Sequence, residues 1–258
     1  MSLLTLPEPA NWPAGGRRLL RLTLVLVAFF AVGVFVGTRS VLRGAYLEAF
    51  VGVGFLLPLI FALIALQLVS RGQSSLRASH DPRGTMLRPD RTFSSLMLVA
   101  FGVVIPVGLV FVVFTLTGDL EMFTSRRARA GAVVLMILAM GTAIASAISA
   151  WRRGGVGYVE LTPTGIDIAN ILRTETVTWE GIAAVDDHSE SNKKTRKAIV
   201  LKLEDGTEKT IDGADFYVPN GVGLYWMVRH YWRHADDRAE LTDGRALERL
   251  RDGRFDLA

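Results

Sequence analysis

Four long apolar segments dominate the first 151 residues of the chain. Charged residues occur only near the ends of these segments, which are Leu19–Gly37, Tyr46–Val69, Thr92–Thr117 and Ala130–Trp151. About 20 mainly apolar residues suffice for a helix to cross the hydrocarbon core of a membrane. The pattern therefore predicts an N-terminal segment over residues 1–18 and a transmembrane four-helix bundle over 19–151, with spans at 19–37, 46–69, 92–117 and 130–151.

The pattern changes after Arg153, where a Gly-Gly-Val-Gly stretch ends the apolar periodicity. Short alternating runs separated by turn residues follow at Tyr158–Leu161, Gly165–Ile171 and Thr174–Trp179. This alternation is typical of antiparallel strands. A second soluble region is therefore predicted over residues 155–258.

A hairpin and a terminal helix complete this region. Ile199, Leu201 and Leu203 alternate with Val200, Lys202 and Glu204, and the Asp205-Gly206 pair favours a tight turn. From Asn220 the apolar period becomes helical, and the face that it predicts consists of Leu224, Met227, Val228 and Tyr231. A shorter helix is expected near Asp243–Arg251.

Three stretches in this order, "LTPTGIDIAN", "TVTWEGIAAV" and "IVLKLEDGTEKTI", resemble the bacterial pleckstrin-homology-like (PH-like) domain of actinobacterial membrane proteins. The resemblance covers about residues 155–235. It implies an all-β, bent antiparallel barrel capped by a C-terminal helix. It also implies a domain that binds proteins or lipids and is not an enzyme, although a fold alone does not determine function.

The charge is distributed unevenly. Residues 1–150 carry a balance of +7 and residues 151–258 a balance of −3. Ten arginines lie on the side of the predicted spans that holds both termini, and five lie on the other side. The positive-inside rule then predicts a multi-pass protein of the cell membrane with cytoplasmic termini. Because the basic residues of the first part lie in loops between spans, nucleic-acid binding is not expected.

The sequence predicts no catalytic residue, cofactor or metal site. It contains no cysteine, no Walker loop, no G-x-S-x-G and no dinucleotide fingerprint. His230 and His234 have a spacing that can place two imidazoles on a metal, but an ordinary helix-end pair has the same spacing. The connection 70–91, with His80, Asp81 and five arginines, is interpreted as charge that orients the spans, the alternative being a site for lipid phosphates.

Small residues and prolines occur at particular positions within the predicted spans. Gly33 and Gly37 form a GxxxG motif, and Gly141, Ala145 and Ser149 repeat at four-residue spacing. Such stripes let helix backbones approach closely, either within a bundle or against the helix of a partner. Two prolines, Pro58 and Pro106, fall in mid-span and predict helix kinks, or alternatively a binding cavity between broken helices.

Four basic residues cluster in a predicted strand connection, namely Lys193, Lys194, Arg196 and Lys197. Because each basic residue near an anionic leaflet contributes roughly 1 kcal/mol of attraction, the cluster predicts contact with anionic lipid headgroups or an acidic partner. The alternative is a solvated loop balanced by the acidic residues that precede it.

These features favour a non-enzymatic membrane protein that acts as an accessory or assembly subunit. Its soluble domain would mediate contact with lipids or proteins, and other membrane subunits or further copies of the chain are the expected partners. A component for transport of lipid or small solutes is the alternative, and a membrane enzyme acting on lipid is a third. A polar cavity at membrane depth would favour transport, whereas an exposed face of small residues would favour a subunit.

Overall fold

The computed structural model describes residues 6–12, 15–120, 125–171, 173–189 and 196–256. Its contacts divide the chain into two compact units. The helical unit comprises Arg17–Gln67 and Ser94–Val156, and the strand unit comprises Met1–Gly16, Leu68–Phe93 and Gly157–Ala258. Three separate stretches of the chain therefore build the strand unit.

Four helices form the helical unit, at the segments that the apolar pattern predicts. Each helix is long and apolar enough to cross a membrane, with a mean hydropathy of 2.2 to 2.9 over its most apolar 18-residue window. Their bounds are α1 Gly15–Leu42, α2 Tyr46–Ser70, α3 Arg91–Thr117 and α4 Arg126–Arg153. The chain thus has the layout of a multi-pass membrane protein.

Glycines set the closest approaches between neighbouring helices. A Cβ atom placed on Gly37 of α1 would lie 3.0 Å from Cγ2 of Val53 on α2. A Cβ atom on Gly54 of α2 would lie 2.6 Å from Cγ2 of Val107 on α3. Because lipid is as apolar as the helices themselves, such close backbone packing is a main source of association between spans.

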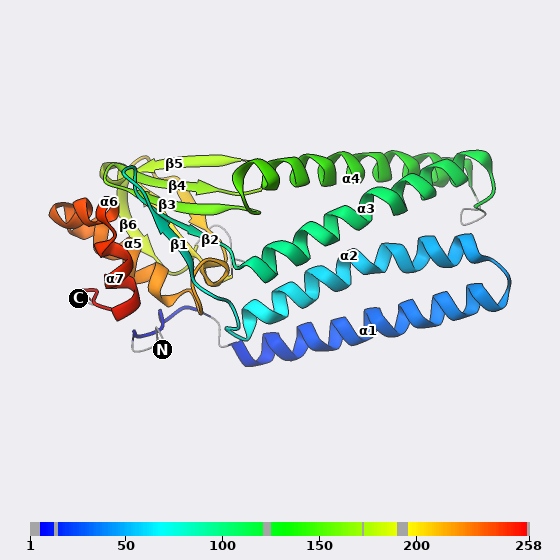
Figure 1. Ribbon diagram of the computed structural model, residues 1–258, viewed down its shortest axis with the longest axis horizontal. Helices are drawn as coiled ribbons and strands as arrows, with labels where there is room; N and C mark the ends of the chain where they lie inside the picture. Colours follow the sequence, from blue (N-terminus) through cyan, green and yellow to red (C-terminus); the bar gives the residue numbers. More distant parts are fainter. Residues whose placement is uncertain (1–5, 13–14, 121–124, 172, 190–195, 257–258) are drawn as a thin grey trace. The chain divides into compact units, whose positions relative to one another are not determined.

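The four helices are buried by the rest of the protein to different extents. A small apolar core around Val51, Phe111 and Leu120 includes residues of α2, α3 and α4, and the rings of Phe55 and Phe111 meet edge to face with centroids 5.3 Å apart. In contrast, only 6% of the most apolar window of α1 is buried, against 17–22% for the other three. Figure 1 shows α1 and α4 on opposite sides of the helical unit.

The strand unit contains two antiparallel sheets. One has five strands in the order β1-β2-β3-β4-β5, and the other has three in the order β6-β7-β8. The bounds are β1 Arg77–His80, β2 Thr85–Arg88, β3 Tyr158–Thr162, β4 Gly165–Ala169, β5 Thr174–Thr178, β6 Ile182–Asp186, β7 Ile199–Leu203 and β8 Glu208–Ile211. The sheets do not close into one barrel, so the layout of strands followed by helices is confirmed and the PH-like barrel is not.

Helices cover the sheets and complete the core. Their bounds are α5 Val222–Arg233, α6 Glu240–Asp243 and α7 Arg245–Asp252, with 3₁₀ turns at Trp179–Gly181, Ala214–Phe216 and Ala235–Ala239. Leu224, Met227, Val228 and Tyr231 of α5 have no exposed surface, and neither do Leu161 and Ile199 of the two sheets. The apolar face predicted for this helix is therefore its buried face.

The connection between α2 and α3 forms part of the larger sheet. It folds into the β1–β2 hairpin, and β2 pairs with β3, so that Thr85 lies opposite Leu161. The hairpin approaches closely because position 84 is glycine: a Cβ atom there would lie 2.3 Å from the carbonyl oxygen of Leu161. The Thr85 hydroxyl also donates to the carbonyl of Leu241, at 2.7 Å. Two of the arginines interpreted as orienting charge, Arg77 and Arg88, are thus strand residues and lie opposite each other.

The segment before α1 also belongs to the strand unit. The indole of Trp12 is buried and donates to the carbonyl of Ala198 at 3.1 Å. A second hydrogen bond runs in the opposite direction along the chain, from the indole of Trp226 on α5 to the carbonyl of Pro7, at 2.9 Å. The N-terminal segment, the hairpin and the C-terminal part are joined by hydrogen bonds, so they lie on one side of any membrane that the four helices cross.

Candidate functional site

Two of the four residues predicted to contact the membrane or an acidic partner are described, and both face inward. Arg196 is 6% exposed, and its guanidinium pairs with the carboxylate of Asp215, which is 2% exposed. The same guanidinium donates to Ser70 Oγ at 3.1 Å and lies over the ring of Phe216, 5.0 Å from its centroid. Arg196 therefore holds loops of the strand unit together, which differs from the expected surface role.

Lys197 is also engaged within the strand unit. Its ammonium donates to the carbonyl of Asn220 at 3.0 Å, pairs with Glu8 at 3.3 Å and lies 5.6 Å from the centroid of Trp12. A cation with these contacts has little freedom to reach a membrane surface. Lys193 and Lys194, the other two residues of the predicted cluster, lie outside the described residues.

The small residues of α1 and those of α4 have different surroundings. Gly33 and Gly37 pack on α2, where Leu56 and Val53 are their nearest neighbours. On α4, in contrast, Gly141 and Ala145 are exposed and Ser149 is half-buried.

The face of α4 that packs within the helical unit uses other residues. Its buried members are Val133, Ala143, Ser146 and Ala150. A Cβ atom on Gly108 of α3 would lie 2.8 Å from Met140 of α4. Gly141 and Ala145 therefore leave a stripe of low side-chain volume on the outer face of α4.

Both predicted kink residues lie within unbroken helices. Pro58 is half-buried inside α2, and Pro106 is exposed on α3. Because Pro106 faces outward, it does not line an internal site. This arrangement favours packed or lipid-facing prolines over a cavity between broken helices.

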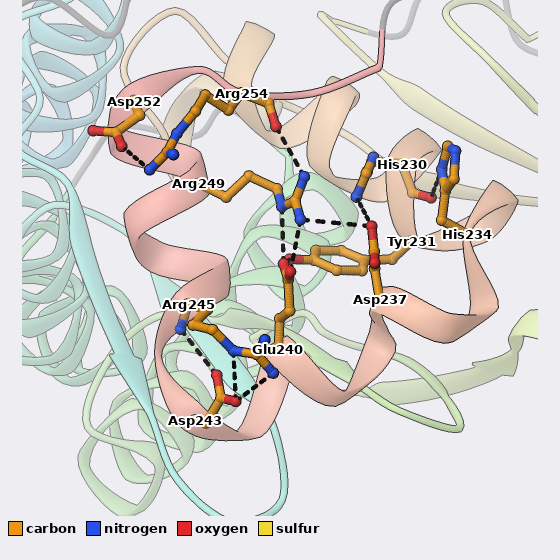
Figure 2. A network of polar contacts seen from close by, with 10 residues as sticks. All are labelled: His230, Tyr231, His234, Asp237, Glu240, Asp243, Arg245, Arg249, Asp252 and Arg254. Carbon is orange, nitrogen blue, oxygen red and sulfur yellow. Dashed lines mark hydrogen bonds and ion pairs between the residues drawn. The ribbon is translucent and has the colours of Figure 1, made fainter.

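A polar network joins α5 to the C-terminal helices (Figure 2). Arg249 of α7 donates to both carboxylate oxygens of Glu240, at 2.6 and 2.8 Å, and Tyr231 donates to the same carboxylate at 3.1 Å. The hydrogen bonds and charge of Arg249 hold the pKa of Glu240 below its ordinary value. Burial, and then the charge of Glu240, raise the pKa of Tyr231.

The two histidines of this network are stacked. The rings of His230 and His234 lie nearly parallel with centroids 4.6 Å apart, and Nε2 of His230 bonds to Asp237 at 2.9 Å. Burial, followed by the charge of Arg249, lowers the pKa of His230. Stacked rings do not point their nitrogens at one ion, and the described residues contain no group of three His, Cys, Asp or Glu that could hold a metal.

A cavity of about 250 Å³ adjoins the network and is lined by Glu240, Arg245, Glu248, Arg249 and Arg254. Both of its other arginines are paired within the protein: Arg245 with Asp243 at 2.7 Å, and Arg254 with Asp252. A carboxylate that already receives a bidentate guanidinium is not available as a base. The network therefore acts as a structural clamp between α5, α6 and α7.

A second cavity, of about 630 Å³, lies between the end of α3 and the start of α4 and has a mixed, largely apolar lining. Its polar lining consists of Thr115, Ser125, Arg126 and Arg129, and its apolar lining consists of Leu116, Ala130, Val133 and Val134. The arginines here were predicted only to orient the spans. The spacing of Arg126 and Arg129, which share one helix face, is the signal that could have marked them.

Comparison with models of protein families, with curated proteins and with solved structures finds no match to the chain.

Proposed function

We propose that the chain is a non-enzymatic accessory or assembly subunit of a membrane complex, with α4 as the helix that docks on a partner span. The observation that carries this proposal is the outer face of α4, where Gly141 and Ala145 are exposed. Small residues that face lipid gain no packing advantage over large ones, because lipid chains pack equally well against either. Against another helix, the same residues allow close backbone contact.

The strand unit supports the same proposal. Its three stretches tie the N-terminal segment and the α2–α3 connection to the C-terminal part through β2–β3 pairing and the Trp12 and Trp226 hydrogen bonds. Such a unit is a stable recognition surface for a soluble region of the partner or for its acidic or lipid groups. A transport role has less support, since both proline-containing spans are continuous helices.

The test uses the full-length chain, purified from native membranes in a mild detergent. We expect a membrane protein to co-purify in fixed stoichiometry, and Gly141→Leu/Ala145→Leu to abolish this recovery by blocking the α4 face. Gly102→Leu is the matched control, because Gly102 is exposed on α3 and an added Cβ would meet nothing within 4 Å. Recovery of the wild-type chain as a lone monomer would contradict the proposal, whereas a pure homo-oligomer would identify the partner as a second copy.

We also propose that the strand unit lies in the cytoplasm, as the arginine balance indicates. Because the chain has no cysteine, a single introduced cysteine is a unique reporter. An impermeant maleimide should label Arg43→Cys in intact cells, and Arg173→Cys only after permeabilisation. Both positions are exposed, Arg43 between α1 and α2 and Arg173 between β4 and β5. The opposite pattern would reverse the orientation.

A further inference from the structure

The cavity between α3 and α4 has the composition of a site for a phosphate headgroup. Arg126 and Arg129 lie three residues apart in the first turns of α4, so both reach the same side of the helix. Arginine is well suited to phosphate because its guanidinium donates two parallel hydrogen bonds. The start of a helix adds a partial positive charge to the same place.

Thr115 provides an independent indication of a ligand. Its side chain lines this cavity and has no exposed surface, and its hydroxyl has no hydrogen-bond partner among the described residues. A buried hydroxyl without a partner is costly, typically by about 1–3 kcal/mol. Threonines in helices often satisfy the hydroxyl through the backbone of the preceding turn, which this one does not do. Nε of Arg129 is likewise buried without a partner among the described residues.

The remaining lining matches a lipid better than a free ion. Leu116 and Val134 are 68% and 57% exposed, on the outer surfaces of α3 and α4. Acyl chains descending from a headgroup would lie along these side chains. Nearby, the carboxylate of Asp119 accepts a hydrogen bond from Thr117 at 2.6 Å.

We propose that this cavity binds the phosphate of an anionic phospholipid, with Arg126, Arg129 and Thr115 contacting the headgroup and Leu116, Val133 and Val134 contacting the acyl chains. The three arginines of this connection, Arg126, Arg127 and Arg129, are the group that runs against the positive-inside pattern. Headgroup binding gives two of them a specific role on that side of the membrane.

The experiment titrates phosphatidylglycerol, as the probe, into the full-length chain and counts bound lipid by native mass spectrometry. We expect Arg129→Gln to weaken binding about tenfold, the effect of one charge-assisted hydrogen bond. Arg127→Gln is the matched control with the same charge loss two residues away, outside the cavity lining, and should leave binding within about twofold. Equal weakening by both variants would reduce the effect to general charge attraction and overturn the proposal.

Thr115→Val gives a second readout, because valine replaces the hydroxyl with a methyl group of the same shape. In phosphatidylcholine nanodiscs the variant should be at least as stable as the wild type, and in phosphatidylglycerol it should bind roughly fivefold more weakly. Lower stability in phosphatidylcholine would mean that the hydroxyl serves the fold, which would overturn its role in binding.

Inorganic phosphate distinguishes the two sources of the anion. At millimolar concentration, phosphate should not displace phosphatidylglycerol, since it lacks the acyl chains. Complete displacement by phosphate, or equal binding of phosphatidylcholine and phosphatidylglycerol, would contradict a site for an anionic lipid.

Discussion

The buried pair of Arg196 and Asp215 makes a quantitative prediction about the strand unit. Their side chains are 7% and 3% exposed, and Arg196 has further contacts with Ser70 and Phe216. Replacing Asp215 by alanine leaves a buried guanidinium without its counter-ion. Breaking a buried pair in this way typically costs about 3–5 kcal/mol. With a urea dependence of about 2 kcal/mol per molar, the unfolding midpoint should fall by about 2 M.

Tryptophan fluorescence of the full-length chain in nanodiscs is a suitable assay. Four of the five tryptophans, Trp12, Trp179, Trp226 and Trp232, belong to the strand unit, so the signal follows its unfolding. The control is Lys209→Gln, which removes a pair with Glu175 at 2.9 Å whose side chains are 40% and 42% exposed. Exposed pairs contribute at most about 1 kcal/mol, so its midpoint should move by less than about 0.5 M.

A double replacement completes this test. Arg196→Met/Asp215→Leu removes both charges and should recover most of the lost stability, because an apolar pair of similar volume often replaces a buried ion pair without loss. A shift for Asp215→Ala no larger than that for Lys209→Gln would refute the reasoning. It would mean that Arg196 is not held in a buried pair, and the predicted role of the basic cluster in membrane contact would then again apply to Arg196.

Two further predictions concern the helix contacts and the histidine stack. Gly54→Ala should destabilise the helical unit by about 1–3 kcal/mol, since its methyl would lie 2.6 Å from Val107. The control Gly102→Ala should not destabilise the unit, because its methyl meets nothing within 4 Å. Thermal unfolding of both variants in nanodiscs compares them, and equal melting temperatures would contradict the packing of Gly54 against Val107. Burial lowers the pKa of His230 in the folded state, so the unfolded chain binds the proton more readily and stability falls as the pH drops below about 6.5. Urea midpoints at pH 7.5 and 5.5 should therefore differ more for the wild type than for His230→Gln, and an equal difference in both would exclude His230 as the cause.

The local pattern of the sequence was sufficient for the four helices and for most of the C-terminal strands. The helices α1 to α4 cover the predicted apolar segments, and β3, β4, β5, β7 and α5 lie where the alternating and helical patterns place them. Hydropathy over 20 residues and alternation over five are properties of the segment itself. They do not depend on what lies elsewhere in the fold.

The features that sequence reasoning missed depend on distant residues. The strands β1 and β2 are four residues each and rich in polar groups, and their assignment requires β3, about 70 positions later. Nothing in the local sequence distinguishes Arg196 from the other members of its basic run, because its buried partner Asp215 is 19 positions away. Similarly, the cavity site needs Thr115 of one helix next to Arg129 of the next.

The composite strand unit also has a consequence for biogenesis. The hairpin after α2 emerges from the ribosome well before its pairing partner β3, and Trp12 earlier still, so the sheet is completed only after all four spans have been made. If any one span failed to insert, the hairpin or the N-terminal segment would be stranded across the bilayer from β3. Completion of the sheet would then report correct insertion, and a chain with an inverted span would expose unpaired strand edges to quality control.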